Sequence, residues 1–312
     1  MSLGRFLARV VVASVAATAL ADYVLPRVIP RPGRLVRVGG RNIHVLTRGD
    51  GPPVLLIHGL GGQLGNFYAL IDELVAPGFR VIAYDRAAAG DSDPAPPEQA
   101  HVDAQAILAA AVLRSTTDRP ALVIGHSLGG AVALRLALDR PDLVGGVMTV
   151  GGLVQPEPPG RIGPLSRLLA RSAVARQVAL RGFGLPGGAI AAPAVLAASF
   201  GPEPMPLAFL WRGLGAKSGT TKALAGIARD LVIVLDDMPG LAGDLPALTV
   251  PLTLMHGSED RILDPRDQAV ALAARMPRAR LHLVPGGGHM LPVTRPALIT
   301  GAIRDLASAG AG

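Results

Sequence analysis

The segment Gly125-His126-Ser127-Leu128-Gly129 constrains this chain more than any other part of its sequence. An apolar run, Ala121-Leu122-Val123-Ile124, precedes it and predicts a buried strand, and residues 131–138 follow with the apolar spacing of a helix. A serine bracketed by glycines between a strand and a helix has the pattern of a nucleophile elbow. The sharp turn lifts the hydroxyl clear of the sheet, and the helix packs so closely on the strand that bulky flanking side chains are excluded.

The composition is that of a chain with one large folded unit. Of the 312 residues, 50% are apolar and 17% are charged, which is enough apolar material for a sizeable core. The absence of cysteine excludes disulfides, thiolate nucleophiles and thiolate metal sites. The net charge is +7, but the arginines form no run of four and no aromatic residues alternate with them. We therefore expect no nucleic-acid binding and attribute the arginines to coding bias and surface solubility.

Residues 1–33 are expected to precede the folded core. Arg5 and Arg9 lead into the apolar segment 10–21, which ends in Ala19-Leu20-Ala21, the pattern of a secretory signal peptide. The apolar run is shorter than the roughly twenty residues of a spanning helix, and an uncleaved membrane anchor is the second reading. Export or membrane association through this segment is thus expected, with a cytoplasmic location as the alternative. A non-helical linker is predicted from three prolines, Pro26, Pro30 and Pro32.

Strand and helix patterns alternate over residues 34–150 and again over 246–312, which predicts an α/β core. An antiparallel hairpin is expected over residues 34–46, turning at Gly39-Gly40, with His44 on its solvent side. Further strands are expected at residues 53–57, 79–85, 121–124, 143–150, 250–255 and 280–284. Helices are expected at residues 64–75, 101–114, 131–138, 266–276 and 296–307.

Residues 151–245 break this alternation. The segment is rich in proline and glycine and shows helical stretches near residues 165–180, 189–198 and 220–235, without strands between them. We interpret it as a helical cap inserted into the core, with an apolar content suited to covering a hydrophobic cleft. A loose helical decoration without a gating role is the alternative.

Three polar residues follow successive predicted strands: Ser127, Asp260 and His289. The carboxyl ends of parallel strands share one sheet edge, where open α/β sheets place their ligands. Serine is a weak nucleophile unless an imidazole takes its proton, and the imidazole needs a carboxylate to fix its tautomer. Asp260 is preferred over Glu259, which precedes it and is expected to point away, and over Asp264, which has the position of a helix cap.

An oxyanion hole requires two backbone N–H groups aimed at the carbonyl oxygen of a substrate. Leu128, directly after Ser127, offers one of them. Leu60, in the glycine-rich turn His58-Gly59-Leu60-Gly61-Gly62, is the candidate for the other. This turn lacks the G-x-G-x-x-G spacing of a dinucleotide site, and the chain has no H-E-x-x-H motif, so no cofactor and no metal are expected.

From residue 34 to about residue 307 the sequence resembles the α/β-hydrolase superfamily. The motifs that carry the resemblance are His58 to Gly62, Asp85-Arg86 with Gly90 and Ser92, Gly125 to Gly130, Gly257 to Asp260, and Gly288-His289. The resemblance implies an eight-stranded, mostly parallel sheet flanked by helices, with the cap after the sixth strand. Relatives usually carry Pro-Gly where this chain has Ala87-Ala88, and we expect a change in the local shape of that turn.

These residues together predict a serine hydrolase that cleaves hydrophobic carboxylic or acyl-lipid esters through an acyl-enzyme. A carbon–carbon bond hydrolase or a cofactor-free haloperoxidase would use the same constellation, so both stay open. A non-catalytic binding protein with a hydrolase-like fold is the third hypothesis, although that reading predicts a broken triad. The sequence does not determine the oligomeric state.

Overall fold

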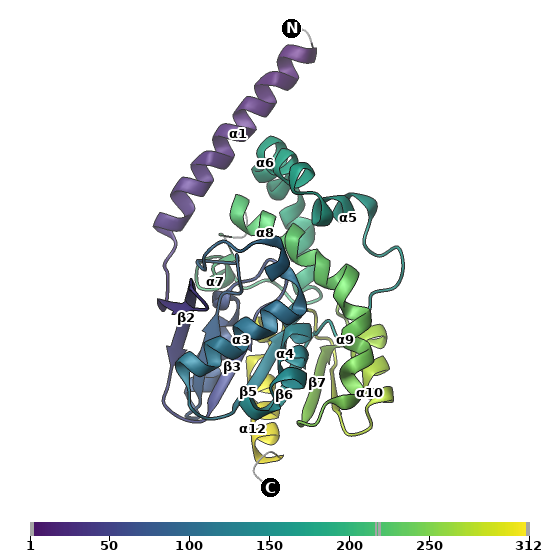
Figure 1. The fold of residues 1–312 in the computed structure, drawn as a ribbon. Helices are drawn as coiled ribbons and strands as arrows, with labels where there is room; N and C mark the ends of the chain where they lie inside the picture. The colour runs from purple at the N-terminus through teal and green to yellow at the C-terminus, as the bar shows by residue number, and fades with distance from the viewer. Residues whose placement is uncertain (1–2, 216, 218–219, 310–312) are drawn as a thin grey trace.

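The computed structural model describes residues 3–215, 217 and 220–309 and is built around one eight-stranded sheet (Figure 1). The strand order is β1-β2-β4-β3-β5-β6-β7-β8; β2 is antiparallel to β1 and β4, and all other neighbours are parallel. The strands are β1 (Arg34–Val38), β2 (Arg41–Arg48), β3 (Pro53–Ile57), β4 (Arg80–Tyr84), β5 (Ala121–His126), β6 (Val144–Val150), β7 (Leu252–Gly257) and β8 (Arg280–Val284). The expected α/β class and mostly parallel sheet are confirmed.

The central strands are continuous apolar runs because both of their faces are covered. Along β3, Leu55 and Ile57 belong to one buried cluster, and Val54 and Leu56 belong to another on the opposite face. The first cluster lies under α3 (Val102–Thr116), α4 (Leu128–Asp139), α9 (Met238–Asp244) and α10 (Ala271–Arg275). The second lies under α2 (Tyr68–Val75) and α12 (Pro296–Ala309).

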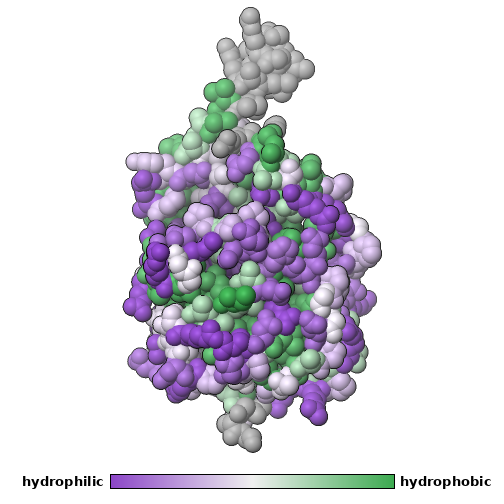
Figure 2. Space-filling model, viewed as in Figure 1, coloured by the Kyte–Doolittle hydropathy of each residue, from purple (hydrophilic) through white to green (hydrophobic). Residues whose placement is uncertain are grey.

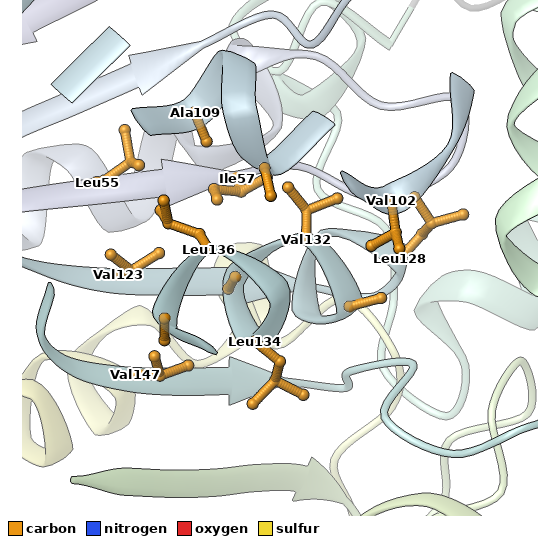
Figure 3. Close-up of a cluster of buried hydrophobic side chains, with 14 of the residues drawn as sticks. Leu55, Ile57, Val102, Ala109, Val123, Leu128, Val132, Leu134, Leu136 and Val147 are labelled. Carbon is orange, nitrogen blue, oxygen red and sulfur yellow. The ribbon is translucent and has the colours of Figure 1, made fainter. Parts of the chain in front are cut away.

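Helix α4 is the element that the first cluster surrounds (Figure 3). Its residues Leu128, Val132 and Leu136 pack among Ile57 and Val123 of the sheet, and all five are at most 2% exposed. Short helices complete the connections in the core: η1 (Leu64–Phe67), η2 (Pro97–Ala100), η3 (Pro141–Leu143), η7 (Arg266–Val270) and α11 (Leu291–Thr294). The helix that follows the elbow is therefore fixed by close packing along its length.

Between β6 and β7 the described chain is helical: α5 (Pro164–Arg171), α6 (Ala173–Phe200), α7 (Ala208–Trp211), α8 (Thr221–Val232), η5 (Ile233–Asp237), α9 and η6 (Leu245–Ala247). The boundaries differ from expectation, because the helix expected over 165–180 ends at Arg171. Ser172 begins α6 by accepting a 3.1 Å hydrogen bond from the backbone N–H of Ala175. Helix α6 then continues to Phe200 without the interruption expected before residue 189.

The N-terminal segment is one long helix, α1 (Leu3–Val28), which extends from the body of the molecule along α6 (Figure 1). The expected non-helical linker starts later than Pro26, since α1 passes Pro26 and ends at Val28, and residues 29–33, with Pro30 and Pro32, are non-helical. A proline so near the end of a helix removes only one backbone hydrogen bond and leaves the preceding turns intact. Among the described residues, no helix is long and apolar enough to cross a membrane.

His44 is buried, which corrects its expected place on the solvent side of β2. Its Nδ1 lies 2.7 Å from Oδ2 of Asp85, and its Nε2 lies 2.6 Å from the carbonyl oxygen of Pro32. These two contacts tie the segment after α1 to the sheet. The prediction assumed that buried and exposed residues alternate along the strand, but β2 buries three consecutive residues, Ile43, His44 and Val45.

Ala88 adopts a φ of 59° in the turn where relatives usually carry glycine. A Cβ in this left-handed region costs about 1 kcal/mol. Ala88→Gly should therefore raise the free energy of unfolding by about 1 kcal/mol in urea denaturation. Ala89→Gly is the matched control, because Ala89 is not among the residues with positive φ. An equal gain in both variants, or none in Ala88→Gly, would contradict this account.

Candidate active site

Ser127 stands at the carboxyl end of β5 with a φ of 55° and a ψ of −128°, a strained backbone for any residue but glycine. Its N–H donates to the carbonyl oxygen of Val150 at 3.1 Å, and its own carbonyl accepts from Gly130 at 2.8 Å and Leu153 at 2.9 Å. These bonds join the turn to the end of β6 and the chain beyond it. The neighbouring strand thus holds the strained conformation in place.

The flanking glycines are required by space. A Cβ on Gly125 would collide with the carbonyl oxygen of Gly129, and one on Gly129 would collide with the carbonyl oxygen of Ile57. Across the site, a Cβ on Gly59 would lie 2.6 Å from Cβ of Ser127. The elbow, the start of α4 and the turn after β3 therefore pack backbone against backbone.

Asp260 and His289 form the hydrogen-bonded pair expected from the sequence. Nδ1 of His289 lies 2.7 Å from Oδ2 of Asp260, and both residues are at most 8% exposed. Burial alone would raise the pKa of Asp260, but the nearby charge of His289 and hydrogen bonds from His256 and His289 outweigh it and hold the pKa well below its usual value. The carboxylate is ionised and can only accept, so Nδ1 of His289 donates to it.

His256 is a further partner of this carboxylate that was not predicted from the sequence. Its Nε2 lies 3.0 Å from Oδ2 of Asp260 and 3.1 Å from the carbonyl oxygen of Leu263. The other carboxylate oxygen accepts from the N–H groups of Ile262 at 2.8 Å and Leu263 at 3.0 Å. Four donors therefore fix the orientation of Asp260. The position of His256 four residues before Asp260 was a signal that could have indicated this contact.

His126 connects this pair to the elbow. Its Nε2 lies 3.0 Å from the carbonyl oxygen of His289, and the two ring centroids are 4.9 Å apart. A Cβ on Gly151, after β6, would lie 3.3 Å from Nδ1 of His289 and 3.4 Å from Oδ2 of Asp260. The ends of β5, β6, β7 and β8 thus meet at one place. Among the described residues, no hydrogen bond joins the hydroxyl of Ser127 to His289, a contact that often tightens only when substrate binds.

The backbone N–H groups of Leu60 and Leu128 are available to a ligand in the described part of the chain. Leu128 is the first residue of α4, and no acceptor is paired with either N–H. Leu60 is 37% exposed, at the edge of the turn that approaches Ser127 through Gly59. The two groups have the availability that an oxyanion hole requires.

Arg86 orients the turn that contains Leu60. Its Nε donates to the carbonyl oxygen of His58 and its Nη2 to that of Gly59, both at 3.0 Å. Nη2 also lies 2.7 Å from Oδ2 of Asp230 on α8, and both side chains are at most 3% exposed. Because the guanidinium binds two consecutive carbonyl groups, it fixes the peptide planes of the turn. Arg86 of the Asp85-Arg86 motif therefore stabilises the turn that carries the candidate oxyanion donor Leu60.

Two other polar features lie beside the candidate site. A cavity of about 290 Å³ borders the turn at Gly61–Gln63 and is lined by Lys217 and Lys222, but Ser127 and His289 do not line it. His44, Asp85 and Asp91 also lie within metal-ligand distance of one another. Their atoms already pair with the carbonyl of Pro32, with backbone N–H groups and with Lys217, so the cluster is a satisfied network.

Known proteins resemble this chain over most of its length. The family model described as alpha/beta hydrolase fold matches residues 52–190. The relative named "Putative carbamate hydrolase RutD", from Rhizobium rhizogenes, is 31% identical over 258 residues, which are 81% of this chain and 92% of that protein. The chain belongs to the alpha/beta-hydrolase family. A 2-hydroxy-6-oxo-6-phenylhexa-2,4-dienoate hydrolase of Burkholderia cepacia is 26% identical, over 79% of this chain and 84% of that one.

Solved alpha/beta hydrolases have the same fold. A thermophilic esterase from Thermogutta terrifontis superimposes with a TM-score of 0.70 at 23% identity, over 89% of this chain and 99% of that chain. Membership of the alpha/beta-hydrolase family makes this protein a hydrolase. Within that family, the relatives differ in the bond that they cleave.

Two buried histidines of the site should make stability depend on pH. Burial and the charge of Arg86 lower the pKa of His58 from 6.5 to about 4, and burial and His289 lower that of His126 from 6.5 to about 3. Below pH 6.5 these two histidines bind protons in the unfolded chain but not in the folded chain. The free energy of unfolding therefore decreases as the pH is lowered. The loss is about 2 kcal/mol per histidine at about pH 5 and absent above pH 7.

Urea denaturation across this pH range measures the effect. His126→Gln should remove the contribution of one histidine, whereas His282→Gln, on an exposed position of β8, should leave the slope unchanged. A free energy of unfolding that stays constant between neutral and mildly acidic pH would contradict the assignment.

Proposed function

We propose that the protein is a serine hydrolase of hydrophobic carboxylic esters, with Ser127 as nucleophile, His289 as general base and Asp260 as its orienting carboxylate. The observation that carries the proposal is the strained Ser127 turn at the end of β5, joined through His126 to the hydrogen-bonded pair His289–Asp260. Serine, histidine and aspartate occur in the chain order of this family. Each supplies a step that ester cleavage requires.

The reaction would proceed through an acyl-enzyme. Nε2 of His289 takes the proton of the Ser127 hydroxyl while Oγ bonds to the ester carbonyl carbon, and the N–H groups of Leu60 and Leu128 stabilise the resulting oxyanion. The intermediate collapses, the carbon–oxygen bond to the alcohol breaks, and His289 returns the proton to the departing alkoxide. Water then attacks the acyl group with His289 as base, which releases the acid and restores the Ser127 hydroxyl.

The surroundings of these groups favour an apolar substrate. Leu60 lies in the candidate oxyanion turn, and Met290 directly follows His289. Met290 belongs to a buried cluster with Phe200, Phe209 and Val293. The N–H of Met290 donates to the carbonyl oxygen of Ser199 at 3.2 Å, so the end of α6 rests on the histidine loop. We propose that residues 151–245 act as a cap that contributes these apolar walls and sets the size of the acyl group.

Other reactions fit the same three residues. Carbamate hydrolysis is the second candidate, because the relative from Rhizobium rhizogenes is 31% identical and bears a name of that class. Carbon–carbon bond hydrolysis and cofactor-free haloperoxidation use the same nucleophile and base. The relative activity of the protein on each substrate class distinguishes these reactions from ester hydrolysis. A non-catalytic role would require that none of these substrates is turned over.

The proposal is tested by measuring hydrolysis rates on three substrate classes. These are p-nitrophenyl esters of increasing acyl length, a carbamate, and a vinylogous diketone. The unaltered protein should prefer esters. Ser127→Ala should lower kcat by about four to six orders of magnitude, because the nucleophile and base act as a unit. Asp260→Asn should lower it by about four orders of magnitude through the wrong histidine tautomer.

The matched control exchanges a histidine outside the site. His289→Ala should lower kcat as far as Ser127→Ala does, whereas His282→Ala, on an exposed position of β8, should keep the rate of the unaltered protein. Full ester hydrolysis by Ser127→Ala would refute the assignment of the nucleophile. Turnover of the carbamate or diketone in place of esters would refute the assigned substrate class.

A further inference from the structure

From Val12 onward, where its side chains are described, helix α1 exposes five large apolar side chains and buries Ser14 and Thr18. Ser14 and Thr18 are 6% and 7% exposed, whereas Val12 and Leu20 are 68% and 63% exposed. A helix packed on a protein in water normally has the reverse arrangement. Small and hydroxyl-bearing residues at a helix contact, with apolar residues outside, are instead typical of helices surrounded by lipid.

The same exposure continues onto α6, which packs along α1, and onto α5, which packs against α6. Eleven of the nineteen exposed large apolar side chains found in the described part of the chain lie on α1, α5 and α6. They are Val12, Val15, Leu20, Tyr23, Val28, Leu165, Leu168, Val174, Val178, Ile190 and Val195. We call them, with the exposed Arg27, Arg167 and Arg171, the α1/α5/α6 surface. Apolar side chains are visible at that end of the molecule, away from α12 (Figures 1 and 2).

The excess positive charge of the chain lies in the same segments. Residues 1–33 contain four arginines and one aspartate, and residues 155–200 contain five arginines and one glutamate. These two segments therefore hold all seven excess charges, and the rest of the chain has twenty-one basic and twenty-one acidic residues. The attribution of the arginines to coding bias and general solubility does not explain this distribution. Arg167 and Arg171 of α5 are both exposed, and Arg171 also pairs with Asp236 at 2.7 Å.

We propose that the α1/α5/α6 surface binds an anionic lipid bilayer. Apolar side chains would enter the region of the acyl chains, and guanidinium groups would pair with lipid phosphates, which they bind with two parallel hydrogen bonds. A second copy of the chain is a poorer occupant, because a symmetric contact through this surface would bring arginines against arginines. The proposal concerns binding and does not depend on the assigned reaction.

Packing of α1 along α6 favours retention of α1 over its removal as a signal peptide. Two contacts hold the end of α1 and the segment after it on the core: Oδ1 of Asp22 accepts a 2.8 Å hydrogen bond from the backbone N–H of Thr221, and Arg31 lies 3.4 Å from Asp91. Both residues follow Ala21, so these two contacts would survive cleavage there. Cleavage after Ala21 would remove the helix that covers α6 and much of the proposed surface.

Flotation of the full chain with lipid vesicles tests the proposal. Vesicles of phosphatidylcholine with phosphatidylglycerol should bind the protein more tightly than vesicles of phosphatidylcholine alone, and added salt should weaken the difference. The double variant Arg167→Gln/Arg171→Gln should lower the partition coefficient on anionic vesicles by roughly fivefold to twenty-five-fold, about fivefold for Arg167 and less for Arg171, which pairs with Asp236. The double variant Val178→Ser/Ile190→Ser should lower binding to both kinds of vesicle.

Two control variants change the same residue types elsewhere on the surface. Arg278→Gln/Arg280→Gln and Ile107→Ser/Leu298→Ser alter exposed positions outside α1, α5 and α6 and should bind like the unaltered chain. Absence of vesicle binding, or equal losses in the controls, would overturn the proposal. The proposal would also be overturned if the protein formed a dimer that the α5 and α6 variants dissociate, and if no protein bound to the vesicles. An intact mass beginning at Asp22 in protein purified from its membranes would contradict the role of α1.

Discussion

The close approach of α4 to the ends of β3 and β5 is the constraint on which the rest of the site depends. Gly125 and Gly129 leave no room for a Cβ, so the backbone of the elbow touches the backbone of the helix and of β3. This contact forces Ser127 into its positive φ and leaves the first N–H of α4 unpaired beside the serine. The proposed nucleophile and the proposed oxyanion donor thus arise from the same packing.

Buried histidines and carboxylates then hold the loops around that elbow. His126 binds the loop of His289 through its backbone carbonyl, His256 binds the carboxylate that orients His289, and Arg86 binds the turn of Leu60. Each is a polar group in an apolar region, where an unpaired donor or charge would be costly. The network therefore permits one arrangement of the loops and leaves Nε2 of His289 and two backbone N–H groups for a substrate.

Much of the core could be predicted from the sequence because its signals are local. Continuous apolar runs predicted β3 and β5, and the chain order of Ser127, Asp260 and His289 predicted residues that the fold brings to one sheet edge. Contacts between distant segments left no such signal. The burial of His44 depends on Asp85 and Pro32, and the hydrogen bond of His126 depends on a carbonyl 163 residues away. Likewise, the inverted burial of α1 appears only once α6 lies beside it.

The central claim is that this packing makes Ser127 the nucleophile of a hydrolase. Labelling with a fluorophosphonate, followed by mass spectrometry of the proteolysed chain, tests it without knowledge of the substrate. The account predicts one phosphonyl adduct, located on Ser127, and its loss when His289 is replaced by alanine, because a serine without its base reacts slowly. An unlabelled protein, or an adduct on another residue with Ser127 unmodified, would contradict it.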